Sequence, residues 1–181
     1  QSSNVGTNFA SLNFNQPFTE VPVLLASVAS YNESDAVTTR LWNITTTGFK
    51  FVMQEQESRN RYHALESVCY IAWEPSSVLL DGVKYQVFRS GVEVGSEWHS
   101  IAYPESFNGV PKCIADFQTV ISLDTIAMRY HFKDAVQMEV KAEEEASYDA
   151  ELYHPSEAVG MICVEDAKGL VAAYNFDEGS G

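Results

Sequence analysis

Apolar and more polar side chains alternate at every second position in several stretches of this chain. Val37, Thr39 and Leu41 alternate with Thr38, Arg40 and Trp42, and the same alternation runs through residues 49–53, 126–133 and 136–140. A period of two is that of a β-strand with one packed face and one solvent face. The pattern therefore predicts strands in all of these stretches.

Two shorter stretches, 24–28 and 68–73, are nearly continuous apolar runs, which suit strands buried on both faces. Clusters of turn-forming residues at 32–35, 45–48 and 75–77 separate the predicted strands. No segment convincingly predicts a helix. Many short strands divided by turn signals predict an all-β fold class with antiparallel β-sandwich architecture.

The same series of residues occurs twice along the chain. Matching residues are 89 positions apart, and the shift becomes 91 after a two-residue insertion that follows Ser147. Matching pairs include Phe18 and Phe107, Asp35 and Asp124, Arg40 and Arg129, Glu55 and Glu144, Tyr62 and Tyr153, and His63 and His154. A repeat of this kind predicts two copies of one structural unit. We expect two tandem antiparallel β-sandwich modules at residues 1–82 and 83–166, with residues 167–181 as a tail or the start of a following domain.

The charge of the chain restricts its partners. It carries 25 acidic and 11 basic residues, which gives a net charge of −14. This charge repels a phosphate backbone and so excludes nucleic acid as a partner. The same argument disfavours polyanionic sugars and leaves neutral sugars open. No apolar run approaches the roughly 18–20 residues of a membrane span, so we expect no membrane partner.

The chain has three cysteines, Cys69, Cys113 and Cys163. Their odd number and wide spacing do not match a metal site. Cys69 and Cys163 lie in apolar runs, so we interpret both as buried structural thiols.

One series of core and turn residues covers nearly all of the first copy. The series consists of Phe18, Pro22-Val23, Asp35, Arg40, Trp42-Asn43-Ile44-Thr45, Gly48-Phe49, Val68 and Tyr70-Ile71-Ala72-Trp73-Glu74. It resembles the H-type lectin domain. The resemblance implies a six-stranded antiparallel sandwich that binds galactose or N-acetylgalactosamine, often as a trimer.

The segment 169–181 is similar to the opening strand of concanavalin-like or laminin-G-like sandwich domains. Domains of this kind follow one another in large secreted bacterial proteins. This second resemblance implies an extracellular or cell-surface location, with other domains of the same parent protein as partners. Residues 1–4 do not match a signal peptide, and we expect the sequence to come from inside a longer protein.

The H-type resemblance also implies a set of carbohydrate-binding residues. In the first copy these are Asn32, Glu33, Asp35, Arg40, Trp42, Glu57, Arg59, Arg61, Tyr62 and His63. Their counterparts in the second copy are Asp124, Arg129, His131, Tyr153 and His154. Two alternatives stay open: Asp35 and Arg40 pair to fix a turn, and Trp42 packs rather than binds.

The sequence indicates a non-catalytic protein. The Tyr-His pairs at 62–63 and 153–154 lack a nucleophile motif, and no phosphate loop or zinc signature occurs. We predict no cofactor and no metal ligands. The acidic run 143–145, with Asp149 and Glu151, has calcium binding as its alternative, but neighbouring strand residues point to opposite faces and favour a solvated edge.

These observations together predict a carbohydrate-binding module that recognises a neutral or galactose-type polysaccharide and targets a larger secreted protein. The alternative is a structural spacer or protein-adhesion module without a sugar site. The surroundings of Trp42 distinguish the two, because cover from the second copy would favour the spacer.

Overall fold

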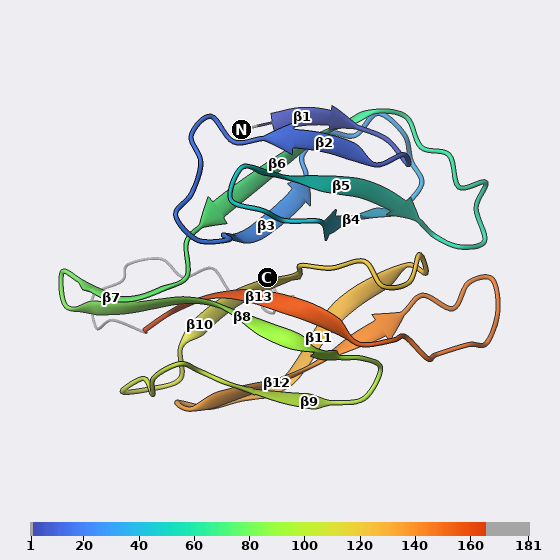
Figure 1. Ribbon diagram of the computed structural model, residues 1–181. Coiled ribbons are helices and arrows are strands. Elements are labelled where there is room, and N and C mark those ends of the chain that lie inside the picture. Colours follow the sequence, from blue (N-terminus) through green and yellow to red (C-terminus); the bar gives the residue numbers. More distant parts are fainter. Residues whose placement is uncertain (1, 166–181) are drawn as a thin grey trace, which may run out of the picture.

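The computed structural model describes residues 2–165, which form thirteen β-strands joined by loops and contain no helix (Figure 1). The strands are β1 (Ser2–Val5), β2 (Ala10–Asn13), β3 (Val23–Val28), β4 (Val37–Trp42), β5 (Gly48–Glu55), β6 (Glu66–Trp73), β7 (Ser76–Leu80), β8 (Val83–Val94), β9 (His99–Ala102), β10 (Lys112–Phe117), β11 (Ile126–Lys133), β12 (Gln137–Glu144) and β13 (Glu157–Val164). The predicted all-β fold class is therefore confirmed. The tail at 167–181 and its resemblance lie outside the described residues.

The strands form four sheets, and every pair of neighbouring strands is antiparallel. Two sheets, in the orders β1-β6-β3 and β2-β5-β4, come from residues 2–75, which we call the N-terminal half. The other two, in the orders β10-β13-β8-β7 and β11-β12-β9, come from residues 76–165, the C-terminal half. In Figure 1 the two halves lie one above the other.

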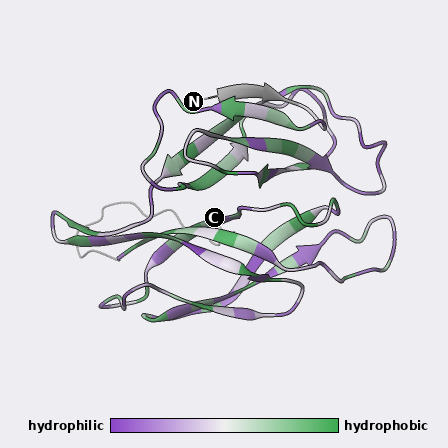
Figure 2. Ribbon diagram, in the orientation of Figure 1, coloured by the Kyte–Doolittle hydropathy of each residue, from purple (hydrophilic) through white to green (hydrophobic). Residues whose placement is uncertain are grey.

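Each half has a hydrophobic core of its own. The core of the N-terminal half includes Leu12, Leu24, Leu41 and Phe51, and that of the C-terminal half is built of residues between Phe88 and Cys163. Figure 2 shows hydrophobic segments in the strands of both halves. Leu41 on β4 lies opposite Phe51 on β5, and both side chains are buried. The sequence predicts one packed face and one solvent face for this sheet, but the other half covers the second face as well, so that Arg40 and Val52 are also buried.

Backbone hydrogen bonds of the N-terminal half recur in the C-terminal half at shifts of 89 and 91. The Phe14 N–H donates to the Thr47 carbonyl, and 89 positions later the Tyr103 N–H donates to the Val136 carbonyl, each at 2.9 Å. β3 and β10 are related by a shift of 89, and β6 and β13 by a shift of 91. The module boundaries proposed from the sequence stay a prediction.

A tight hairpin between β7 and β8 lies where the sequence divides the two copies. Asp81 and Gly82 have φ values of 51° and 81°, which is what both central residues of a type I′ turn require. The predicted boundary between residues 82 and 83 falls at this turn. Ser76 and Ser77, expected in a turn, instead begin β7 and pair with β8.

The cysteine prediction is wrong. Cys163 is buried but forms a disulfide with Cys113, its direct partner in the β10–β13 register, and Cys69 on β6 is free and exposed. A residue in an apolar run cannot reveal its partner on a strand 50 positions away. The disulfide joins two neighbouring strands of the C-terminal half.

The two halves pack directly against each other through β3. Val23 contacts Val87 and Ile162 in a small apolar cluster. Beside it the Gln118 amide bonds the backbone of Leu24 twice, because Oε1 accepts from its N–H at 3.0 Å and Nε2 donates to its carbonyl at 2.7 Å. The Gln118 side chain thus forms the two backbone hydrogen bonds that a neighbouring strand would otherwise form with Leu24.

Within residues 2–165, no helix is long and apolar enough to cross a membrane.

Candidate functional site

A cleft of about 340 Å³ lies between the two halves and is lined by both. The N-terminal half contributes Asn8, Phe9, Glu57 and Arg61, among others, and the loop before β11 contributes Asp124. The cleft therefore depends on how the halves pack and is not a property of either alone. Two of the lining residues, Glu57 and Arg61, belong to the carbohydrate-binding set that the sequence predicts.

One aromatic side chain, Phe9, lines this cleft, and a second, Trp42, packs against it. The Phe9 ring packs on Trp42 with 5.1 Å between ring centroids, and the two residues are 42% and 40% exposed. Lys50 places its Nζ 5.0 Å from the Trp42 ring. These contacts hold the two rings in place while leaving an apolar surface open to solvent. In the C-terminal half, the counterpart pair is Trp98 and His131, at 4.1 Å.

Glu57 links the cleft to the C-terminal half. Its Oε1 accepts the Thr125 N–H at 3.2 Å, and its own N–H donates to Glu145 at 2.9 Å. Burial raises the pKa of the Glu57 carboxyl, and the negative charges of Asp124 and Glu145 act in the same direction. The cleft lining contains three carboxyl groups, those of Glu55, Glu57 and Asp124, and one basic side chain, Arg61.

Three other predicted residues of the first copy lie together next to the cleft lining. Arg59 contacts Asp35 through an ion pair of 3.5 Å, and the buried His63 ring places Nε2 3.1 Å from the Asp35 carbonyl and Nδ1 2.9 Å from the Ala64 carbonyl. Burial lowers the pKa of His63, but these hydrogen bonds and nearby carboxylates outweigh it and raise the pKa. Both ring nitrogens of His63 are thus engaged by the backbone.

Asn32 lies close to His63, because both are within reach of the Glu66 carboxylate. The Asn32 backbone N–H donates to Glu66, and its side-chain amide donates to the Leu65 carbonyl. Both groups are therefore used in hydrogen bonds to the loop before β6 and to the start of that strand. Tyr62 is 68% exposed. The structure therefore brings Asp35, Arg59 and His63 together, and places Glu57 and Arg61 in the cleft.

Arg40 is buried between the halves and is only 1% exposed. Its guanidinium donates to Glu157 at 2.6 Å, to Gln54 at 3.1 Å and to the Asp124 carbonyl at 3.2 Å. The pairing with Asp35 that the sequence suggested does not form, because Asp35 faces Arg59 instead. Arg40 presents no exposed surface to a sugar in this arrangement.

Among the predicted residues of the second copy, Asp124 and His154 lie near each other, whereas Arg129 and His131 form exposed ion pairs of their own. Arg129 pairs with Glu143, and His131 lies 3.3 Å from Glu139, all on the outer surface of the sheet β11-β12-β9. Tyr153 is 68% exposed. Asp124 lines the cleft, whereas His154 is buried behind it.

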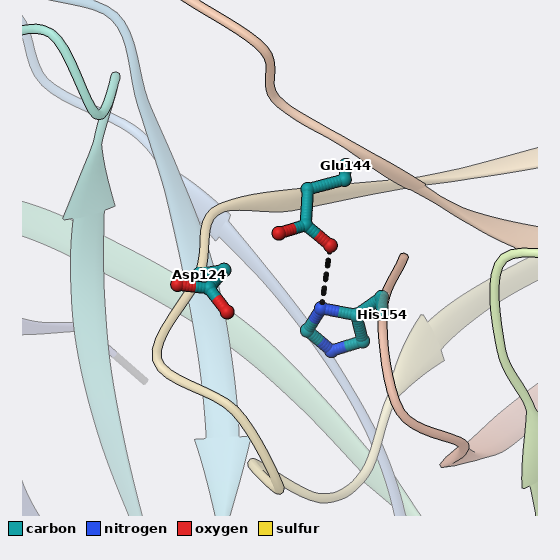
Figure 3. A group of neighbouring side chains, drawn as sticks. All are labelled: Asp124, Glu144 and His154. Carbon is teal, nitrogen blue, oxygen red and sulfur yellow. Dashed lines mark ion pairs between the residues drawn. The ribbon is translucent and has the colours of Figure 1, made fainter. Parts of the chain in front are cut away.

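Asp124, Glu144 and His154 form a compact cluster beside the cleft (Figure 3). One potential ligand atom from each lies within 4.8 Å of the others. Glu144 and His154 are buried, and the Glu144 Oε2 lies 3.3 Å from the His154 Nδ1. Burial raises the pKa of Glu144, against the opposing effect of His154. One nitrogen and two carboxylate groups together match the donor set of a divalent metal ion.

A second cluster, of Glu33, Asp35 and Glu55, lies in the N-terminal half and offers only carboxylate oxygens. Glu55 is buried there, at the position equivalent to Glu144. Sequence reasoning missed both buried glutamates, although a signal was present. Glu144 has the same strand parity as Met138, Val140 and Ala142, all of which face the core. The acidic run at 143–145 is thus not uniformly solvated.

Comparison of the chain with protein-family models, with curated proteins and with solved structures found no match. The resemblance to the H-type lectin domain stays a prediction that rests on the residues quoted above.

Proposed function

We propose that this protein is a non-catalytic carbohydrate-binding module for a neutral or galactose-type polysaccharide, with its ligand in the cleft between the halves. The observation that carries the proposal is the pairing of an open aromatic surface with polar side chains at one cleft. Phe9 lines that cleft, packs on Trp42 and is exposed, and Asn8 and Arg61 line it too.

Sugar recognition needs a flat apolar surface for the C–H face of the ring and a few directed polar groups for its hydroxyls. Phe9 supplies the first requirement, while Asn8, Glu57 and Arg61 supply the second. The net charge of −14 and the excess of carboxyl groups in the cleft lining disfavour an anionic sugar. A neutral polysaccharide therefore fits this surface best.

The surroundings of Trp42 support binding over the spacer alternative. Its ring contacts are with Phe9 and Lys50, both from its own half, and it keeps 40% of its surface exposed. A Trp that served only to join the two halves would be covered by the second one. The exposed Trp42 and Phe9 together form a surface that a ligand can reach.

The disulfide supports an extracellular or cell-surface location for the parent protein. Bonds such as Cys113–Cys163 persist mainly in oxidising compartments. A binding module in that setting would attach other domains of its parent protein to a polysaccharide.

A glycan array followed by calorimetry tests the proposal. We expect binding to a neutral glycan, and a loss of affinity of about tenfold or more in Phe9→Ala, Trp42→Ala and Arg61→Ala, since each removes on the order of 1.4 kcal/mol of contact. Trp98→Ala is the matched control, because Trp98 is the counterpart of Phe9 and does not line the cleft.

An array without any bound glycan would count against the proposed function. Unchanged affinity in Phe9→Ala and Trp42→Ala would count against the cleft as the site. A loss confined to Trp98→Ala would move the site to the C-terminal half.

A further inference from the structure

The buried His154 ring is hydrogen bonded at Nε2, whereas its Nδ1 lies at ion-pair distance from the Glu144 carboxylate without forming a hydrogen bond. Its Nε2 lies 3.2 Å from the Oε1 of Glu157. The Arg40 guanidinium and the Thr119 hydroxyl hydrogen bond the same carboxylate and favour its ionised form. An ionised carboxylate beside Nε2 favours the tautomer with the proton on that nitrogen, which leaves a lone pair on Nδ1.

The His154 Nδ1 faces the Glu144 carboxylate and has no hydrogen-bond partner among the described residues. The Glu144 Oε2 is buried and equally without one. Buried polar atoms are rarely left unpaired, and each such group calls for an explanation. Here the two atoms lie 3.3 Å apart, with a carboxylate oxygen of Asp124 within 4.8 Å of both (Figure 3).

This separation suits two ligands of one small metal ion. Zinc binds histidine nitrogen and carboxylate oxygen at about 2.0–2.1 Å in tetrahedral geometry, which places two neighbouring ligand atoms about 3.3 Å apart. Asp124 is exposed, so its carboxylate has room to move toward the other two. Three protein ligands with one position open to water form a common arrangement for zinc.

The equivalent histidine of the N-terminal half behaves differently. His63 places both ring nitrogens against backbone carbonyls, those of Ala64 and Asp35, at 2.9 and 3.1 Å. The same position in the repeat is therefore hydrogen bonded at both ring nitrogens in one half and only at Nε2 in the other. This contrast indicates that the His154 arrangement is not a requirement of the fold.

We propose that Asp124, Glu144 and His154 bind a divalent transition-metal ion of the zinc type, with Glu157 as the positioning residue behind His154. The hydrogen bond from Nε2 to Glu157 is the contact that commonly orients a metal-bound histidine. The ion offsets the negative charges of two clustered carboxylates, to which Glu57 adds a further negative charge nearby. The site adjoins the cleft through Asp124, but its existence does not depend on sugar binding.

Zinc titration of the full chain tests this proposal directly. The protein is treated with a chelator, dialysed and titrated with zinc chloride by calorimetry at about pH 7.5, where histidine is neutral enough to bind metal. We expect one zinc ion per chain. Loss of even an outer partner weakens a metal site on the order of 10–100-fold, so we expect Asp124→Asn and Glu144→Gln to weaken it by about 100-fold or more.

Asp124→Asn is the decisive variant, because an exposed position tolerates substitution without loss of the fold, and circular dichroism checks the fold. Glu143→Gln is the matched control for Glu144→Gln. Glu143 directly precedes Glu144 on β12, points to the other face of the sheet and pairs with Arg129, so the variant removes one charge without touching the cluster. We expect that control to keep full zinc affinity. The ¹⁵N chemical shift of the His154 Nδ1 provides a second measurement and should change on zinc addition.

Absence of zinc binding would overturn the proposal, and so would zinc binding that survives in Asp124→Asn and Glu144→Gln. Loss of zinc in Asp35→Asn alone would place the ion in the cluster of Glu33 and Glu55 and overturn it as well. Because the glycan array measures a separate property, failure here and failure of the proposed function can be told apart.

Discussion

Arg40 and Glu157 form an ion pair of 2.6 Å between the two halves, and their side chains are 1% and 0% exposed. Arg40 lies on β4, and Glu157 begins β13. The guanidinium also donates to the Asp124 carbonyl, and the Glu157 carboxylate also accepts from Thr119 and from the Ile121 N–H. The pair therefore fixes the position of β4 against the loop that precedes β11.

Replacing Arg40 should destabilise the protein strongly. Arg40→Met leaves the buried Glu157 charge without its cation, and breaking a buried pair in this way costs about 3–5 kcal/mol. Urea unfolding measures this loss. Arg129→Met, at the equivalent exposed position, should cost less than about 0.5 kcal/mol. Similar losses in the two variants would show that the buried pair contributes little.

Removing the disulfide should also lower stability. The bond joins residues 50 positions apart, and closing a loop of that length stabilises a folded chain by about 4 kcal/mol in the chain-entropy model. We expect the double variant Cys113→Ala with Cys163→Ala to lose about 2–4 kcal/mol in urea unfolding. Cys69→Ser, at the free and exposed cysteine, should change stability by less than about 0.5 kcal/mol. A double variant as stable as the parent would contradict the prediction.

The period of the side chains predicts the strands well, because it depends only on neighbouring residues. The burial of Leu41 and Phe51 follows from their alternation, and the repeat relates strands with the same pairing. The contact between Arg40 and Glu157 lies 117 positions apart and arises only when the halves pack. No pattern among neighbouring residues can show that Arg40 will contact Glu157. The alternation of β4 therefore places Arg40 on the solvent face, and the sequence predicts it as a sugar-binding residue.

The candidate site shows the same division between local and long-range information. The H-type resemblance named Glu57 and Arg61, which line the cleft, but it did not name Phe9, whose contact with Trp42 joins separate segments. Glu144 was predictable from its parity on β12, since every second residue from Met138 onward faces inward. Its contact with His154 depends on the fold of the loop 145–156 and could not be read from the pattern.

Gly160 should tolerate no larger side chain. It lies on β13 where the halves meet, and an added Cβ would come within 2.6 Å of the Gln118 side chain and 2.7 Å of Val23. Gly160→Ala should therefore cost about 1–3 kcal/mol, as overpacking usually does. Gly109→Ala is the control, because nothing lies within 4 Å of its added Cβ. Equal unfolding midpoints in urea would show that the packing between the halves can yield.

Asp116 should make the protein less stable as the pH rises toward neutral. Its Oδ2 accepts the Ala26 N–H of the other half at 3.0 Å, and burial raises the pKa of this carboxyl from 3.8 to about 7, although backbone hydrogen bonds and Arg40 oppose the shift. A raised pKa means that the folded protein binds this proton more tightly than the unfolded chain does. The contribution is thus present below about pH 4, and is lost progressively until the pH passes about 7.

Asp116→Asn isolates this contribution, because the neutral amide still accepts the Ala26 N–H and does not ionise. We expect the variant to equal the parent near pH 4 and to exceed it by on the order of 4 kcal/mol at about pH 8, since the pKa shift spans about three units and each unit corresponds to 1.36 kcal/mol. Urea unfolding across this range measures the difference. Asp81→Asn, at the exposed hairpin turn, is the control and should leave the pH dependence unchanged. If Asp116→Asn and the parent lose stability in parallel as the pH rises, another group causes the pH dependence of unfolding. Ionisation of Asp116 would then not destabilise the folded protein.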